Sequence, residues 1–520
     1  MQFTQGLHRA VQQRPTQIAT VCGDRVRSFI ELRNRVARFA GALKTQGVRR
    51  GDRVAILGLN SDRYLETYLA CAWIGAVVNP VNFRWSVPEI SYSLNDSKST
   101  VLVIDSQFSP QADAIKAESP TLQQLIFMGD GDCPAGMLDM EALIAGAEPV
   151  ADADVGGDEL FGIFYTGGTT GKPKGVMLSH LNVCSSGLAL LSEGAFAEGT
   201  IALHAAPMFH LADMMVSVSV LLRGGQHIMA PLFRPDLILG LISHWKITDL
   251  LLVPAMLQAL ADSPDMRNTD TSSVARVLYG ASPIAEAVLD RAMAALPTAS
   301  FTQVYGMTEM SAVMTVLPPY YHSQEGRAAA KLRSGGRAAY HTQVSILGED
   351  DTELPRGSVG EICVRGPHIM QGYLNKPEAT AEALRGGWMH TGDLGYMDDD
   401  GYVFIVDRSK DMIISGGENV YSTEVENAVA KHPAVAAVAV IGIPSEAWGE
   451  AVHAAVVLKP EQTLTLDALA AHCKTLIAGY KCPRSMEVIP ALPLSGAGKV
   501  LKTELRTPFW EQQKRKINYC

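Results

Sequence analysis

The segment Tyr165-Thr-Gly-Gly-Thr-Thr-Gly-Lys-Pro-Lys-Gly175 gathers hydroxyl groups, glycines and two lysines into one short stretch. The apolar run at 160–164 before it predicts a buried strand, and residues 176–180 predict the strand that returns. Glycines let backbone N–H groups turn toward a ligand, while threonines add donors and lysines add positive charge. The segment therefore predicts a polyphosphate-binding loop between two strands, and a polar surface hairpin is the structural alternative.

The loop differs from a Walker A sequence, in which four residues separate the glycines and Gly-Lys-Ser/Thr follows. Here three residues separate Gly167 from Gly171, and Pro173 follows Lys172. Proline at this point also disfavours the helix that a Walker loop must open. The spacing argues against a Walker-type ATPase.

Composition sets broad limits on the function. The chain has 520 residues, of which 47% are hydrophobic and 19% charged, so several structural units with large cores are expected. The net charge of −10 gives no basic footprint for nucleic acid. Anionic ligands would need local positive groups against this acidic field.

Cysteine usage and hydropathy indicate a cytoplasmic protein. The eight cysteines form no CxxC pair and are irregularly spaced, which disfavours a zinc site or a disulfide framework. No signal-peptide core and no apolar run near eighteen residues is found, so no transmembrane segment is expected. Peripheral contact with a membrane stays compatible with a lipid substrate, and a homodimer is allowed.

Strand and helix patterns alternate through the first two thirds of the chain and predict an α/β fold. After about residue 340, short strands and dense glycine predict a β subdomain. A final stretch of about a hundred residues predicts a small α+β domain. We therefore expect an N-terminal domain at 1–407 with parallel sheets, helices and a β subdomain, a hinge at 408–411, and a mobile C-terminal domain at 412–520.

Four later segments carry chemistry that suits a nucleotide, although each is also common in ordinary loops. A tyrosine ring can pack on a purine, a glutamate offers a hard oxygen to Mg²⁺, an aspartate can accept both ribose hydroxyls, and a lysine can offset charge at phosphorus. The segments are Tyr305-Gly-Met-Thr-Glu309, Trp388-Met-His-Thr-Gly-Asp393, Asp407-Arg-Ser-Lys-Asp411 and Pro493-Leu-Ser-Gly-Ala-Gly-Lys-Val500.

Together with the loop at 165–175, and in the same order, these segments resemble the adenylate-forming superfamily of acyl-CoA synthetases, luciferases and peptide-synthetase adenylation domains. The resemblance covers most of the chain and implies ATP, Mg²⁺ and CoA as cofactors and a small-molecule carboxylic acid as substrate. It implies that Tyr305 stacks on adenine, Thr308 contacts the α-phosphate, and Glu309 binds the metal. It also implies that Asp393 and Arg408 hold the ribose.

Further roles follow from the same resemblance. Lys499 would bridge the substrate carboxylate and the α-phosphate, and it joins Glu309, Thr308 and His210 as catalytic residues. The nucleotide-binding residues implied are Thr166, Gly167, Gly168, Thr169, Thr170, Gly171, Lys174, Gly280, Ala281, Ser282, Tyr305, Gly306, Met307, Thr308, Asp393, Arg408 and Lys499.

The C-terminal part resembles the CoA-binding surface of aryl and fatty acyl-CoA ligases. The CoA-binding residues implied are Gly416, Gly417, Trp448, Tyr480 and Arg484. Cys482 departs from relatives that carry a basic residue there, which puts one phosphate contact in doubt. Lys410 matches the pivot of the family hinge, where many relatives carry aspartate.

The acyl pocket is expected to be apolar, with His210 in a positioning role. Its candidate residues are His210, Ala212, Met214, Tyr279, Val304, Met307 and Ala312. Such walls suit a hydrocarbon or aryl acid, and no arginine cluster indicates a dicarboxylate. The sequence favours a medium- or long-chain fatty acid, with a cinnamate- or benzoate-type acid as the alternative. An ATP-binding sensor without turnover is the alternative from another class, disfavoured because Glu309, Asp393 and Lys499 are all present.

Overall fold

The chain divides into two units, each described here by itself. Residues Met1–Val344 and Val364–Met389 form the first unit, and Ser345–Cys363 and His390–Cys520 form the second. The computed structural model describes residues 1–166, 173–282, 284, 286–408, 411–415, 418–445, 447–494 and 500–517. The hinge predicted at 408–411 lies inside the second unit, and its role as a pivot stays a prediction.

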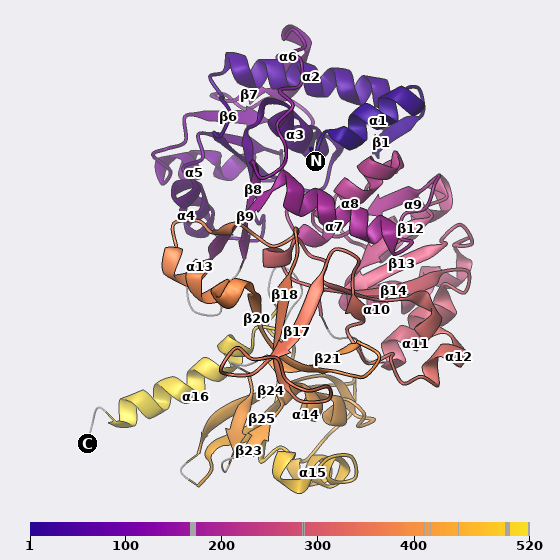
Figure 1. Ribbon diagram of the computed structural model, residues 1–520, viewed down its shortest axis with the longest axis vertical. Coiled ribbons are helices and arrows are strands. Elements are labelled where there is room, and N and C mark those ends of the chain that lie inside the picture. The colour runs from indigo at the N-terminus through magenta and orange to yellow at the C-terminus, as the bar shows by residue number, and fades with distance from the viewer. Residues whose placement is uncertain are drawn as a thin grey trace. The chain divides into compact units, whose positions relative to one another are not determined.

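A nine-stranded sheet forms one half of the first unit, in the order β16-β15-β14-β13-β12-β10-β11-β1-β2 (Figure 1). The strands are β1 Ile18–Cys22, β2 Arg25–Ser28, β10 Ile201–His204, β11 Gln226–Met229, β12 Asp249–Leu252, β13 Arg276–Gly280, β14 Ser300–Tyr305, β15 Thr315–Leu317 and β16 Arg337–Ala338. The central strands are parallel, while β2, β15 and β16 are antiparallel.

An eight-stranded sheet forms the other half, in the order β19-β9-β8-β4-β3-β5-β6-β7. The strands are β3 Arg53–Leu57, β4 Val77–Pro80, β5 Val101–Ile104, β6 Gln124–Phe127, β7 Leu138–Asp139, β8 Leu160–Thr166, β9 Lys174–Ser179 and β19 Gly372–Tyr373. β9 and β19 are its antiparallel strands. Every residue of β5 is buried, as expected for a parallel strand covered on both faces.

Within the described residues, thirteen α-helices of the first unit cover these sheets. They are α1 Gln5–Gln13, α2 Phe29–Thr45, α3 Asp62–Ile74, α4 Val87–Ser97, α5 Ala112–Ala117, α6 Met140–Gly146, α7 His180–Ser192, α8 Leu211–Arg223, α9 Pro235–Trp245, α10 Pro254–Ala261, α11 Glu286–Ala295, α12 Gln324–Arg327 and α13 Pro377–Ala383. No helix within the described residues combines the length and the apolar character that a membrane span needs.

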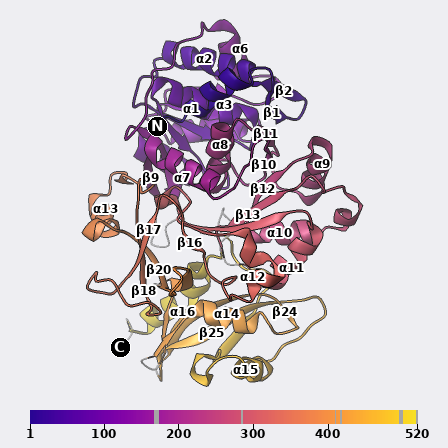
Figure 2. The same cartoon turned by 45° about the vertical axis from the view of Figure 1, so that its right-hand side comes forward.

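The core of the nine-stranded sheet shows how strand alternation positions the helices. Val277 and Tyr279 lie on one face of β13 and pack with Leu289 of α11 and Leu257 of α10. Figure 2 shows α9, α10 and α11 beside β12 and β13. Each fully buried aliphatic side chain contributes roughly 1.5–3 kcal/mol of transfer free energy. This burial holds the carboxyl ends of the parallel strands at one edge.

A five-stranded sheet (β23-β22-β25-β24, with β26 on β25) lies in the second unit, and a four-stranded sheet (β17-β18-β20-β21) lies mostly in it, with the ends of β17, β18 and β20 assigned to the first unit. The strands are β17 Gln343–Leu347, β18 Gly360–Arg365, β20 Met389–Met397, β21 Val403–Arg408, β22 Ile413–Ser415, β23 Glu418–Val420, β24 Val435–Ser445, β25 Gly449–Leu458 and β26 Ser485–Val488. The helices are α14 Ser422–Val429, α15 Leu466–Lys474 and α16 Lys502–Ile517. The α/β class and the mixture of parallel sheets with a β subdomain are confirmed.

One predicted strand boundary is wrong. The return strand was expected at 176–180, but β9 runs from Lys174 to Ser179, and His180 opens α7. Ser179 ends the strand because its Oγ accepts the Asn182 N–H at 3.1 Å while Asn182 Oδ1 accepts the Ser179 N–H at 2.8 Å. This reciprocal cap satisfies backbone donors that the helix start would otherwise leave unpaired.

A buried ion-pair cluster joins α2 and α3, which pack against each other. The fully buried carboxylate of Glu66 receives two bonds from Arg35, at 2.6 and 2.9 Å, and Arg35 also contacts Glu141. Burial raises the pKa of Glu66, and the arginine offsets only part of that effect. Substituting only one residue of the pair is therefore expected to lower the stability, because the other residue is left as an unpaired buried charge.

We predict that Glu66→Ala lowers the free energy of unfolding by about 3–5 kcal/mol, since Arg35 would stay buried with half of its partners gone. Equilibrium urea unfolding measures the loss. Asp270→Ala is the control, because the Asp270–Lys246 pair is more than half exposed on each side and is expected to contribute little. Equal losses in the two variants would contradict the assignment of stability to the buried pair.

Candidate active site

The predicted phosphate loop connects two paired strands. In the antiparallel register of β8 and β9, Tyr165 lies opposite Gly175 and Thr166 lies opposite Lys174. Thr166 and Lys174 therefore face each other where the loop begins and ends. Gly167, Gly168, Thr169, Thr170 and Gly171 lie outside the described residues. The strand–loop–strand arrangement that the sequence predicts is confirmed by its two ends.

A second predicted residue, Glu309, is linked to the end of this loop through contacts of Tyr373. Glu309 lies in the short 3₁₀ helix Thr308–Met310, is 6% exposed, and accepts a hydrogen bond from Tyr373 Oη at 2.9 Å. Lys174 Nζ lies 4.7 Å from the centre of the Tyr373 ring, within the range of a cation–π interaction. Burial and the nearby Glu309 charge raise the pKa of Tyr373, so its hydroxyl stays a donor. This arrangement brings a cation and a carboxylate together, as phosphate and Mg²⁺ would require.

Sequence reasoning missed Tyr373. Its segment, Gly372-Tyr373, carries no charge and lies 64 residues from Glu309 along the chain. Only the pairing of β19 with β9 brings it beside Lys174. No pattern in the sequence gives that pairing.

The turn predicted to contact adenine has strained backbone. Ala281 follows Gly280 at the end of β13 and has φ of +67°, a left-handed conformation that alanine rarely adopts. Ser311 and Ala312, which follow the Glu309 segment, have φ of +48° and +70°. Such residues cost of order 1–3 kcal/mol each and concentrate at ligand sites. Two of the three positions, Ala281 and Ala312, are candidate site residues from the sequence.

Two glycines in these segments allow close approach of backbone to backbone. A Cβ on Gly280 would lie 2.0 Å from Val304 O, and one on Gly306 would lie 2.3 Å from Ala312 O. The resemblance implies that Gly306 is a nucleotide-binding residue. In the structure, the approach that excludes a side chain is between neighbouring protein segments.

The acyl-pocket candidates fall into two groups by burial. His210, Ala212, Val304, Met307 and Ala312 are partly exposed, as residues that line a cleft must be. Met214 and Tyr279 are buried. Tyr279 belongs to the core beneath α11, and its hydroxyl lies 2.8 Å from His322 Nε2. This places the Tyr279 side chain among core residues.

The start of α8, which His210 precedes as N-cap residue, is fixed by a buried chain of polar groups. Asp213 Oδ2 lies 2.6 Å from His204 Nδ1, and His204 Nε2 lies 2.9 Å from His227 Nδ1. All three side chains are fully buried. Burial lowers the pKa of His227 far below its usual range, so this imidazole is neutral, and burial raises the pKa of Asp213. Sequence reasoning missed this chain, because isolated histidines in strands give no pairing signal.

In the second unit, the two residues predicted to hold ribose lie opposite each other. Asp393 of β20 pairs in register with Arg408 of β21, and Asp393 is 7% exposed. Directly opposed residues on antiparallel strands have Cβ atoms about 4.5–5.5 Å apart. Asp407, the preceding residue, accepts hydrogen bonds from the Ser422 hydroxyl at 3.0 Å and from the Ser422 N–H.

The predicted CoA surface contains an exposed cation–aromatic stack. Arg484 Cζ lies 4.0 Å from the centre of the Trp448 ring, and Trp448 and Tyr480 are 42% and 40% exposed. Cys482 is buried in the core of this unit, where burial raises the pKa of its thiol. Its side chain therefore packs inward. Lys410, Gly416, Gly417 and Lys499 lie outside the described residues.

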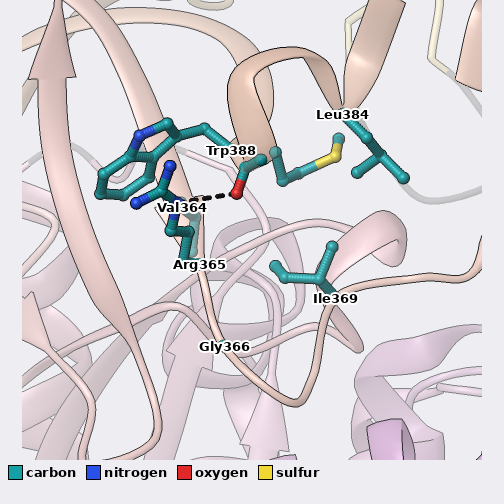
Figure 3. Close-up of a pocket in the computed structure, with 8 residues that line it drawn as sticks. Val364, Arg365, Gly366, Ile369, Leu384 and Trp388 are labelled. Carbon is teal, nitrogen blue, oxygen red and sulfur yellow. Dashed lines mark hydrogen bonds between the residues drawn. The ribbon is translucent and has the colours of Figure 1, made fainter. Parts of the chain in front are cut away.

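A hollow of about 400 Å³ lies in the first unit (Figure 3). It is lined by Val364, Arg365, Gly366, Ile369, Leu384, Gly387, Trp388 and Met389. Arg365 stacks over the Trp388 ring at 3.9 Å and donates to Gly387 O at 2.7 Å. These two contacts hold the Arg365 guanidinium against the side of the hollow. None of the candidate nucleotide-binding residues that the structure describes lines the hollow.

Comparison with known proteins gives the family. The model described as "AMP-binding enzyme" matches residues 7–374, and that described as "AMP-binding enzyme C-terminal domain" matches residues 424–499. Feruloyl-CoA synthase of Amycolatopsis sp. is 41% identical over 96% of this chain and 98% of its own length. The fatty acid–[acyl-carrier-protein] ligase ScoC of Streptomyces coeruleorubidus is 37% identical over 98% of this chain and 96% of its own.

A solved structure agrees with both matches. The ATP-bound MatB of Rhodopseudomonas palustris superimposes with a TM-score of 0.88 and 32% identity, covering 98% of this chain and 99% of the other. The chain therefore belongs to the AMP-binding enzyme family, the adenylate-forming family of acyl-CoA synthetases that its motifs resemble.

Proposed function

We propose that this chain joins a cinnamate-type aromatic acid, of the ferulate and coumarate class, to CoA at the expense of ATP. The observation that carries the choice of acid is the 41% identity to feruloyl-CoA synthase over nearly the whole chain. The apolar, partly exposed candidates Ala212, Val304 and Ala312 are compatible with a flat hydrocarbon framework. A medium- or long-chain fatty acid, which the sequence favours, is the second candidate and is supported by the 37% identity to a fatty acid ligase.

The reaction has two half-reactions. A carboxylate oxygen of the acid attacks the α-phosphorus of ATP and expels pyrophosphate, which gives an acyl adenylate. The CoA thiol then loses its proton and attacks the acyl carbon, and AMP leaves. Activation is needed because a free carboxylate has no good leaving group.

The described residues support the first half-reaction. Glu309, held by Tyr373, would bind Mg²⁺, which supplies charge neutralisation for the phosphates. Lys174, at the end of the loop, provides a cation over the ring of Tyr373, whose hydroxyl donates to Glu309. Asp393 and Arg408, opposed on β20 and β21, would hold the ribose. Lys499, which lies outside the described residues, would by the family resemblance stabilise the charge that develops as carboxylate meets phosphate.

The exposed stack in the second unit supports the second half-reaction. Trp448 offers an aromatic face to the pantetheine arm, and Arg484 keeps a positive charge beside it for the CoA phosphates. Because Cys482 points into the core, a basic side chain at that position is absent from this surface. A cytoplasmic location, a homodimer and a domain boundary at 408–411 remain predictions of the sequence.

Product analysis with a panel of acids tests the proposal. We expect AMP and pyrophosphate, released only when an acid is present, and a higher kcat/KM for ferulate and 4-coumarate than for decanoate and palmitate. A higher kcat/KM for the fatty acids would reject the aromatic acid. Formation of ADP and phosphate would reject adenylate chemistry itself, and ATP binding without acid-dependent turnover would leave only a sensor.

A crossed pair of variants separates the two half-reactions. Lys499→Ala is expected to slow acid-dependent ATP–pyrophosphate exchange by on the order of a hundredfold or more, yet spare thioester formation from supplied acyl adenylate. Trp448→Ala is expected to spare the exchange and raise the KM for CoA, because it removes the platform that Arg484 stacks on. If each variant damaged both half-reactions alike in folded protein, the separate roles would be refuted.

Rotation at the predicted pivot is tested by Lys410→Pro. Proline fixes φ near −65° and restricts the residue before it, Ser409, so a backbone that must change between steps would be locked. We expect ATP–pyrophosphate exchange to persist while thioester formation is lost. Retention of both reactions would show that Lys410 is an ordinary linker residue, and Lys410→Ala controls for loss of the side chain.

A further inference from the structure

Three potential metal ligands of the second unit converge between β18 and β20. Glu361 and Cys363 are two residues apart on β18, so their side chains point to the same face, and His390 lies on the neighbouring β20. His390 Nδ1 lies 2.8 Å from Glu361 Oε2 and 3.3 Å from Cys363 Sγ. The three ligand atoms all lie within 4.8 Å of one another. Within the described residues, no other His, Cys, Asp or Glu group of this size meets that criterion.

These separations are close to what a tetrahedral zinc ion requires. Zinc bonds of about 2.0–2.3 Å to nitrogen, oxygen and sulfur put the ligand atoms roughly 3.3–3.6 Å apart. Movement of the Glu361 carboxylate by a few tenths of an ångström would open the space, and its side chain, 21% exposed, has room for it. Cys363 is fully buried and His390 is 3% exposed, so two of the ligands are already fixed by packing.

Neighbouring polar groups contact or lie near two of the three ligands, as groups that orient the ligands do in metal sites. His390 Nε2 is buried and has no hydrogen-bond partner among the described residues, and Asp351 Oδ1 lies 3.8 Å from it. A carboxylate on the far nitrogen holds a ligating imidazole in the correct tautomer. Glu361 Oε1 accepts the Gly392 N–H at 2.9 Å, which orients the carboxylate while Oε2 faces His390.

We propose that Glu361, Cys363 and His390 form a binding site for a thiophilic divalent cation of the zinc class, with Asp351 as the partner of His390. A thiolate, an imidazole and a carboxylate together suit zinc, whereas Mg²⁺ prefers oxygen ligands alone. Binding displaces the thiol proton of Cys363, and the imidazole proton moves to Nε2, toward Asp351. The site is separate from the Mg²⁺ site at Glu309, which lies in the first unit.

An ion bound at this site would link β20, the strand that carries Asp393, to the neighbouring strand β18. His390 and Asp393 lie on the same strand, and Gly392 between them is already bonded to Glu361. A bound ion would cross-link β18 and β20 three residues from Asp393. Ligand binding to the folded state raises the apparent stability of this sheet.

The alternative is a hydrogen-bonded cluster that binds no ion, with His390 shared between the thiol and the carboxylate. The two alternatives differ in the protonation of Cys363. A metal site requires the thiolate, whereas a hydrogen-bonded cluster keeps the thiol. Co²⁺ distinguishes them, because a thiolate ligand gives it a charge-transfer absorption in the near ultraviolet.

The test uses the full chain, reduced and stripped of metal with a chelator, and titrates it with Co²⁺ and then with Zn²⁺. We expect the thiolate band to saturate at one equivalent and to disappear as Zn²⁺ displaces Co²⁺. Cys363→Ser should lose the band, and Cys133→Ser, which alters a partly exposed cysteine of the first unit, should keep it. Asp351→Asn should keep the band and weaken Zn²⁺ binding by about 10–100-fold.

Absence of the band in the unaltered chain, or its persistence in Cys363→Ser, would overturn the proposal. Circular dichroism and thermal unfolding establish that each variant is folded. If Cys363→Ser fails to fold, Glu361→Gln decides through Zn²⁺ competition with a chromophoric chelator. An affinity unchanged by Glu361→Gln would overturn the site, and a loss comparable to that of His390→Gln would support it.

Discussion

The hydrogen bond from Tyr373 to Glu309 is the contact on which the candidate site of the first unit depends. A carboxylate that is 6% exposed is costly to bury unless it is paired. Tyr373 supplies one donor, and its ring lies against Lys174 at the exit of the loop. Three segments far apart in the chain, β9, β19 and the 3₁₀ helix at Thr308, therefore meet at one place. Mg²⁺ would neutralise the negative charge of Glu309, and a phosphate would neutralise the positive charge of Lys174.

Strained backbone surrounds the same segments. Ala281, Ser311 and Ala312 adopt left-handed conformations where β13 and the Glu309 segment end. A Cβ added at Gly280 would lie 2.0 Å from Val304 O, so the backbones of β13 and β14 lie close together beside Ala281. The nine-stranded sheet thus holds these turns in shape before any ligand arrives, which reduces the ordering cost of binding.

Much of this arrangement could be predicted from the sequence, because it depends on local patterns. The alternation of strands and helices in the first two thirds of the chain, the short strands after about residue 340 and the strand that leads into the loop are as expected. What could not be predicted depends on pairing between distant segments. Tyr373 enters through the β19–β9 ladder, and the chain of His204, Asp213 and His227 forms only when β10, β11 and α8 pack together.

Besides pairing between distant segments, local sequence patterns also do not predict which side chains are buried. The sequence put one phosphate contact in doubt because some relatives carry a basic residue where this chain has Cys482, and the structure places the Cys482 side chain in the core of the second unit. The residue before it, Lys481, is committed to Glu424 by two bonds of 2.7 and 2.8 Å. Arg484, whose guanidinium covers the indole of Trp448, provides a positive charge for an anionic ligand there.

The bonds between Asp407 and Ser422 bear directly on the predicted domain rotation. Asp407 precedes the segment 408–411, and Ser422 opens α14 after it, so these bonds join residues on either side of the predicted pivot. Ser422 is bonded in turn to Lys502, which pairs with Glu426 at 2.8 Å. Hydrogen bonds to a charged group contribute about 1.5–3 kcal/mol each. A rotation about 408–411 that separated Asp407 from Ser422 would break these bonds, and a ligand that favoured the rotated state would have to bind it more tightly by at least that difference.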